Sequence, residues 1–136
     1  MTLIKSISGI RGTIGGEVGT SLSPLDIVRF TASYASFIKK QEHESDTIII
    51  GRDARISGKM VSDIVCGTLI SCGFNVIDIG LSTTPTVEVA VQLHKSAGGI
   101  ILTASHNPKQ WNALKLLNNK GEFLSANDGE EILNLA

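Results

Sequence analysis

Thr47-Ile48-Ile49-Ile50-Gly51 decides the fold class, because it is a short, uninterrupted apolar run closed by a glycine. A run of this kind, without polar alternation, is typical of a strand buried on both faces of a sheet. The residues from 57 to about 72 then place apolar side chains at helical spacing, and Gly73 ends the segment. A buried strand followed by a helix is the repeating unit of α/β proteins, so we expect further units on either side.

Strands and helices are expected to alternate along the rest of the chain. Ser23-Pro24 predicts a helix start, since serine caps helices and proline is favoured in the first helical position. We expect further strands at 3–8, 75–79 and 98–104, further helices at 24–41, 84–93 and from 125, and a hairpin of 114–117 with 122–124. The predicted fold is α/β, a three-layer αβα sandwich with a mixed, mostly parallel sheet.

Length and composition indicate one domain. The 136 residues carry 12 Lys+Arg against 13 Asp+Glu, with 42% hydrophobic and 18% charged residues. This composition excludes disorder, and the near-neutral charge argues against a dedicated nucleic-acid binder. The sequence has neither an apolar window long enough to span a membrane nor a signal peptide at Met1, so no membrane partner is expected.

The chain end and the cysteines carry two further expectations. The last predicted helix reaches Ala136 without a glycine stop or a basic last turn, so we expect residues 1–136 to be one domain of a longer protein whose other domains are absent. Cys66 and Cys72 lie six residues apart in one predicted helix and cannot pair with each other. Unpaired cysteines are typical of a reducing compartment, and we expect a cytoplasmic protein.

Positive charge is concentrated in three glycine-containing stretches, residues 8–12, 51–59 and 105–115. These 25 residues hold six Lys+Arg against Asp53 alone, whereas the other 111 residues have a net charge of −6. Cationic loops on an acidic body favour an anion site, although ordinary solvated charge is the alternative.

Each stretch has a functional and a structural interpretation. Thr103-Ala104-Ser105-His106-Asn107-Pro108 offers Ser105 as a nucleophile or group carrier, or is simply a polar turn. Ser8-Gly9-Ile10-Arg11-Gly12 would present Arg11 to an anion or form a surface turn. Gly51-Arg52-Asp53-Ala54-Arg55 leads into a helix N-terminus, which favours anions, or Asp53 simply pairs with Arg52 or Arg55 to hold the shape of the loop. The chain lacks both GxGxxG and GxxxxGK[ST], so Rossmann and Walker sites are not expected.

Together the three stretches resemble the α-D-phosphohexomutase superfamily, which includes phosphoglucomutase, phosphomannomutase and phosphoglucosamine mutase. The run 103–108 looks like its phosphoserine loop, 8–12 like its Ser-Gly-x-Arg-Gly motif, and 51–58 like its Gly-Arg-Asp-x-Arg-x-Ser-Gly motif, in family order over essentially the whole chain as the first domain. Trp111 and Ala113 stand where many members have Tyr and Gly, so the resemblance leaves open which hexose is used.

The resemblance implies reversible phosphoryl transfer between O1 and O6 of a hexose or hexosamine phosphate. The implied catalytic residues are Ser105, His106, Arg11 and Lys115, and the implied phosphate- or substrate-binding residues are Asn107, Ser8 and Arg52. Mg²⁺ would be bound through the phosphate of Ser105 and by aspartates of other domains, with hexose 1,6-bisphosphate as activator. The alternatives are a serine hydrolase or phosphatase, for which no G-x-S-x-G elbow is present, and a phosphosugar-binding module without chemistry.

Overall fold

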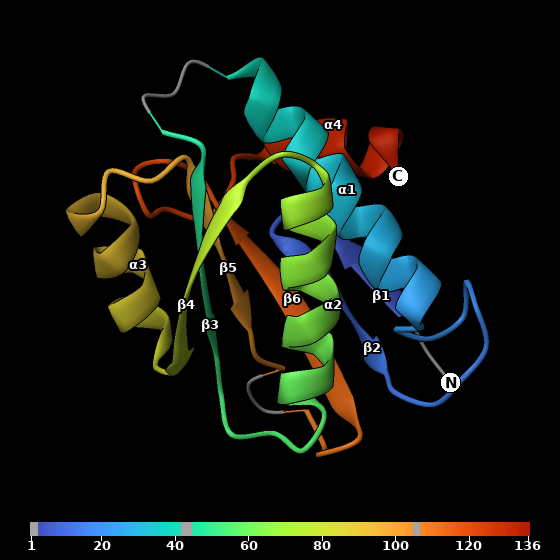
Figure 1. The fold of residues 1–136 in the computed structure, drawn as a ribbon. Helices are drawn as coiled ribbons and strands as arrows, with labels where there is room; N and C mark the ends of the chain where they lie inside the picture. Colours follow the sequence, from blue (N-terminus) through green and yellow to red (C-terminus); the bar gives the residue numbers. More distant parts are fainter. Residues whose placement is uncertain (1–2, 42–44, 105–106) are drawn as a thin grey trace.

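The computed structural model describes residues 3–41, 45–104 and 107–136 of the chain. These ranges form a single six-stranded sheet with helices packed on it (Figure 1). The elements in chain order are β1 (Leu3–Ser6), β2 (Gly9–Thr13), α1 (Pro24–Lys40), β3 (Thr47–Arg52), α2 (Gly58–Ser71), β4 (Asn75–Leu81), α3 (Thr84–Leu93), β5 (Gly98–Leu102), β6 (Trp111–Leu117) and α4 (Ala126–Leu135).

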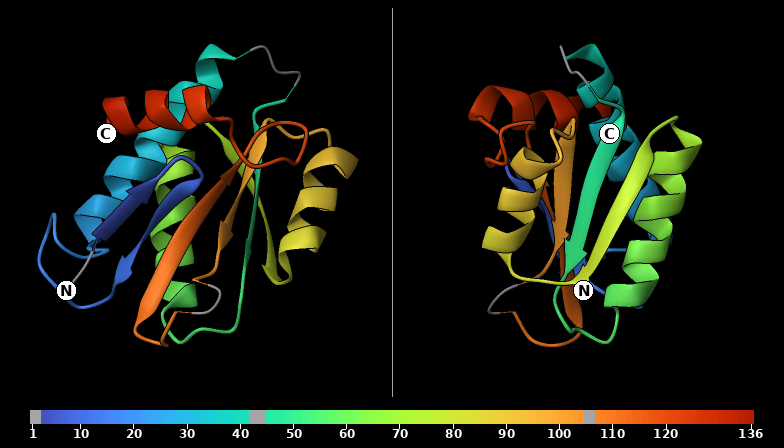
Figure 2. Two further views of the ribbon diagram at one scale, coloured as in Figure 1. Left: turned by 180° about the vertical axis from the view of Figure 1, so that it is seen from behind. Right: turned by 60° about the vertical axis from the view of Figure 1, so that its left-hand side comes forward.

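The strands are ordered β1-β2-β6-β5-β3-β4. β3 pairs in parallel with β4 and with β5, whereas β1 with β2, β2 with β6 and β5 with β6 are antiparallel. Helices α1 and α2 lie on one face of the sheet and α3 on the other, which gives the three layers (Figure 2). Helix α4 packs against α1 and adds Ile132 to the larger core. The α/β class and the mixed sheet are confirmed, with the parallel pairs confined to β5, β3 and β4.

The apolar run of β3 is explained by burial on both faces. Ile48 and Ile50 belong to the larger core beneath α1 and α2, while Ile49 belongs to the smaller core beneath α3. All three are fully buried. Alternation of side chains across a strand therefore gives both faces of the sheet an apolar covering from one continuous sequence.

Two sequence expectations differ from the structure in the antiparallel part. The expected strand 3–8 ends at Ser6, and residues 9–13 form β2 rather than the surface turn considered for 8–12. The expected hairpin of 114–117 with 122–124 contains only an isolated bridge between Leu117 and Phe123. Instead, β6 begins at Trp111 and lies between β2 and β5, which pair with its backbone on both sides, and most of its side chains are buried.

The predicted start of α1 is confirmed. The Ser23 side chain accepts a hydrogen bond from the backbone N–H of Asp26, and Pro24 occupies the first helical position. Further along α1, the buried hydroxyl of Tyr34 donates to the carbonyl of Leu117 (2.6 Å) and lies 3.3 Å from that of Gly99. In the described ranges, none of the helices is long and apolar enough to cross a membrane.

Candidate functional site

Two of the three motif stretches, those that follow β3 and β5, meet at one end of the sheet. β3 and β5 are parallel and paired in register, with Arg52 opposite Leu102, so the loops that follow them begin side by side (Figure 1). The backbone N–H of Asp53 donates to the carbonyl of Leu102 (3.1 Å) and extends the pairing into both loops. Ligands of α/β sheets bind at this carboxyl end of the strands.

Arg55 holds the second half of the loop between β5 and β6. Its guanidinium donates to the carbonyl oxygens of Asn107 (2.8 Å), Pro108 (2.7 Å) and Trp111 (3.1 Å). The Arg55 side chain is largely buried, with 11% of its surface exposed. Three backbone acceptors on one planar cation fix the course of the loop around it.

Asp53 ties Arg55 to the first half of the same loop. Its carboxylate accepts from the backbone N–H (3.1 Å) and the Nε (3.3 Å) of Arg55, and also from the hydroxyl of Thr103 (2.7 Å). Of the two pairings that the sequence left open for Asp53, the structure shows the one with Arg55.

Arg11 and Lys115 lie on one face of the antiparallel pair β2–β6. Arg11 is opposite Ala113 and Lys115 is opposite Gly9, so both side chains leave the sheet on the face away from the larger core. The Arg11 Nη1 lies 3.4 Å from the Oδ1 of Asn107 and donates a hydrogen bond to it. An open hollow with about 550 Å³ of empty space lies over this face and is lined by Arg11, Lys115 and Ser8, among others. The structure therefore brings Arg11, Lys115, Ser8 and Asn107 together.

The other predicted site residues have different positions. Arg52 ends β3, donates from Nη1 to the carbonyl of Asp53 (3.4 Å) and packs against Gly58 at the start of α2, so its described contacts do not place it at the hollow. Ser105 and His106 lie outside the described residues.

Arg55, Thr103 and Asn112 were not predicted as site residues. Asn112 is fully buried at the start of β6, and its amide donates to the hydroxyl of Ser57 (2.9 Å) before α2. The signal in the sequence is a polar residue inside an apolar strand, because a buried amide needs a hydrogen-bond partner.

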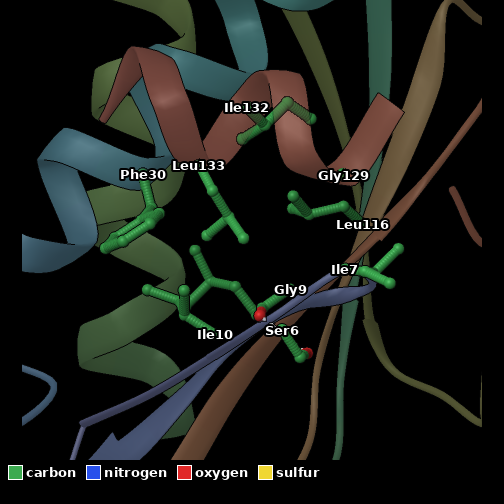
Figure 3. A pocket seen from close by; sticks show the side chains of 10 residues that line it. Ser6, Ile7, Gly9, Ile10, Phe30, Leu116, Gly129, Ile132 and Leu133 are labelled. Atoms are coloured by element: carbon green, nitrogen blue, oxygen red, sulfur yellow. Dashed lines mark hydrogen bonds between the residues drawn. The ribbon is translucent and has the colours of Figure 1, made fainter. Parts of the chain in front are cut away.

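A second pocket differs in chemistry from the hollow. It lies between the β1–β2 hairpin and α4, where Ile132 and Leu133 face Ile10, with Phe30 of α1 at the side (Figure 3). Its empty space is about 260 Å³, and none of the described residues that line it is charged. An anion would find no charged partner among them, so we take the hollow beside Arg11 as the candidate site.

The described residues offer no complete metal site of their own. No group of three or more His, Cys, Asp or Glu side chains among them is arranged to hold a metal ion. Both cysteines are free and half-buried, and burial raises the pKa of the Cys66 thiol, which keeps it protonated and unreactive.

The chain is similar in sequence to known proteins over most of its length. Residues 3–136 match the family model described as phosphoglucomutase/phosphomannomutase, alpha/beta/alpha domain I. The chain is 34% identical over 113 residues to a phosphoglucomutase/phosphomannomutase of Thermococcus kodakarensis, covering 83% of this chain and 24% of the relative. It is 35% identical over 125 residues to a phosphoglucosamine mutase of Helicobacter acinonychis, covering 90% of this chain and 28% of the relative.

A solved structure shows the same fold. A crystal structure from Thermus thermophilus that carries the name phosphomannomutase superposes with a TM-score of 0.84 at 25% identity, covering 99% of this chain and 30% of that one. The chain therefore spans about a quarter of the length of the curated relatives that it matches.

Proposed function

The chain belongs to the phosphoglucomutase/phosphomannomutase family as its alpha/beta/alpha domain I, and from this premise we propose that it is the phosphoserine-bearing domain of a phosphohexomutase. The proposed reaction moves a phosphoryl group between O1 and O6 of a hexose or hexosamine phosphate. The proposed carrier is the hydroxyl of Ser105, and the intermediate is the bisphosphorylated sugar. The remaining domains would belong to the same chain, acting in the cytoplasm.

One observation carries the proposal: two cations line one hollow, and one of them bonds to the loop that contains Ser105. Arg11 and Lys115 project from neighbouring strands on one face, and Arg11 bonds to Asn107, two residues after Ser105. A phosphoserine carries a charge of about −1.5 to −2 and three acceptor oxygens, so it requires cations of this kind. Catalysis of phosphoryl transfer consists mainly of such charge stabilisation and positioning.

The proposed cycle has two balanced steps. A sugar hydroxyl attacks the phosphorus on Ser105, the Oγ–P bond breaks, and the sugar becomes a bisphosphate while Oγ regains a proton. In the second step the Ser105 Oγ attacks the other phosphate, gives up its proton, and the sugar oxygen leaves with one. We propose that Arg11 and Lys115 stabilise the transferring phosphoryl group, that Asn107, Ser8 and Arg52 bind phosphate or sugar, and that His106 takes part in the proton transfers.

Mg²⁺ and hexose 1,6-bisphosphate complete the proposal. We propose that the ion would be held by the Ser105 phosphate together with aspartates outside these 136 residues, since oxygen ligands suit Mg²⁺. When bound, the ion would neutralise charge on the transferring group. The bisphosphate would act as the activator that phosphorylates Ser105.

The test is intact mass spectrometry and a coupled mutase assay on the complete gene product. After incubation with Mg²⁺ and hexose 1,6-bisphosphate, we expect a gain of about 80 Da mapped to Ser105, and turnover that the Ser105→Ala variant loses. Binding of sugar phosphate without phosphorylation would support the binding module, and labelling of Ser105 by an organophosphonate with ester hydrolysis would support the hydrolase.

Residues 1–136 alone are expected to fold without turning over. An arginine clamp alone contributes about 10³–10⁵ to phosphoryl-transfer rates, and the isolated domain would lack the metal ligands, sugar contacts and distal phosphate site together. Turnover of the 136-residue chain at the rate of the complete protein would contradict this expectation.

A further inference from the structure

We infer that Arg55, held by Asp53, is a positioning residue that sets the loop between β5 and β6 for phosphoryl transfer; this inference rests on the proposed function. The pair reaches both flanks of Ser105. Thr103, two residues before it, donates to Asp53, and Asn107, two residues after it, accepts from Arg55. Both flanks of the serine are thus fastened to one ion pair from a different loop.

The chemistry of the contacts requires an arginine. The carbonyl oxygens of Asn107, Pro108 and Trp111 lie at 2.7–3.1 Å from two guanidinium nitrogens of Arg55, while its Nε faces Asp53. A guanidinium presents five donors in a rigid plane, whereas a lysine ammonium is a single point with three. Lysine would keep the charge but could not span this set of acceptors.

The same loop also contacts Arg11, a candidate catalytic cation. The backbone carbonyl of Asn107 accepts from Arg55, while its side-chain Oδ1 accepts from Arg11. A shift of the loop would therefore change the separation between the phosphoserine and Arg11. Misplacement of a reacting group by about 1 Å costs about 10²-fold in rate, so loss of the Arg55 contacts should lower kcat by about that factor.

The experiment compares Arg55→Lys, Arg55→Met and Thr103→Val with the wild type in the complete gene product. Arg29→Lys is the matched control, because Arg29 is a half-exposed arginine on α1 whose ion pair is with Asp26. Three quantities are measured: kcat per phosphorylated Ser105, KM for the sugar phosphate, and hydrogen exchange of the peptide 103–111. Normalising kcat to phosphorylated protein removes any loss caused by unfolded molecules.

We expect Arg55→Met to lower kcat about 100-fold, Arg55→Lys to restore part of it, and Thr103→Val to lower it less. KM should stay within about two-fold, because none of these contacts is made to the sugar, and exchange in 103–111 should rise while the control stays like the wild type. An unchanged kcat, a loss that falls only on KM, or unchanged exchange in 103–111 would overturn the inference.

Different results would show that the proposed function is wrong and that the positioning role of Arg55 is wrong. If the wild type neither carries phosphate on Ser105 nor turns over, the proposed function is wrong, and hydrogen exchange in 103–111 still decides whether Arg55 holds the loop. If the wild type is active and Arg55→Met is equally active, the function stands and the positioning role is wrong.

Discussion

Asp26→Asn is expected to lower the free energy of unfolding by about 2.5 kcal/mol at pH 7. Asp26 is almost fully buried at the third position of α1, and its carboxylate accepts from the backbone N–H of Gly19 (2.9 Å) and the hydroxyl of Ser23 (2.5 Å). These bonds fasten the segment that connects β2, which carries Arg11, to the first turn of α1. Asp26 therefore links the stability of the domain to the geometry of the candidate site.

The magnitude follows from the contacts. Hydrogen bonds to a charged group contribute about 1.5–3 kcal/mol against about 1 kcal/mol for neutral ones, so two bonds lose about 1 kcal/mol each when the acceptor becomes an amide. Loss of a negative charge in the first helical turn adds about 0.5 kcal/mol. The exposed Asp63→Asn is the control, since its ion pair with Lys59 lies in solvent and should contribute little.

The effect should depend on pH with a definite sign. Burial raises the pKa of Asp26, but the hydrogen bonds from Gly19 and Ser23 and the charge of Arg29 outweigh it and hold the pKa below its usual value of 3.8. A depressed pKa contributes stability above the unfolded-state value, and this stability is lost as the pH falls through the folded-state value. Urea unfolding of the 136-residue chain should show the full difference between wild type and variant above about pH 5 and a shrinking one below pH 3.8. A difference that stays constant across this range would refute the reasoning.

Three further substitutions test the site and the packing. Arg11→Met should lower kcat of the complete protein by about 10³-fold or more, while Lys59→Met, at an exposed cation paired within α2, should not; equal activities would contradict the role of Arg11. Tyr34→Phe removes the hydroxyl that donates to the buried carbonyl of Leu117 on β6 and should cost about 0.5–1.5 kcal/mol by urea unfolding, and no measurable change would argue against that bond. Gly129→Ala places a methyl group onto the carbonyl of Ile7 and should lower the thermal midpoint by several degrees, an effect that free repacking of α4 would abolish.

The parallel half of the fold could be predicted because its signals are local. Continuous apolar runs such as Ile48–Ile50 and a serine–proline helix start specify strand and helix without knowledge of their neighbours. β2 could not be predicted in this way, because glycines are depleted in strands and suggested a turn. Gly9 instead serves a close approach: its φ is +149°, and a Cβ there would overlap the carbonyl of Leu114 on β6. The need for a glycine at residue 9 therefore comes from β6, which lies far away in the sequence.

The motifs of the candidate site could be predicted from the sequence. Which element each of its arginines contacts could not. Arg52 and Arg55 lie in one sequence motif, carry the same charge and stand on either side of Asp53. Arg52 is still part of β3 and turns toward α2, whereas Arg55 follows the turn and reaches the β5–β6 loop. The register of β3 with β5 makes this difference, and the sequence around the two arginines does not contain it.

The contacts of the cations also change the charge that is available to an anion. Of the six cations in the three stretches, Arg55 is paired with Asp53 and Lys59 with Asp63, whereas Arg11 and Lys115 line the hollow. If the proposed phosphoserine binds at this hollow, two cations against its charge of about −1.5 to −2 would leave the hollow near neutrality. The hollow would be positive when the serine is free, which in the proposed cycle is the state that binds the bisphosphorylated sugar. The attraction that these two cations provide for a second phosphate would therefore be weak while the proposed carrier is phosphorylated and strong while it is free.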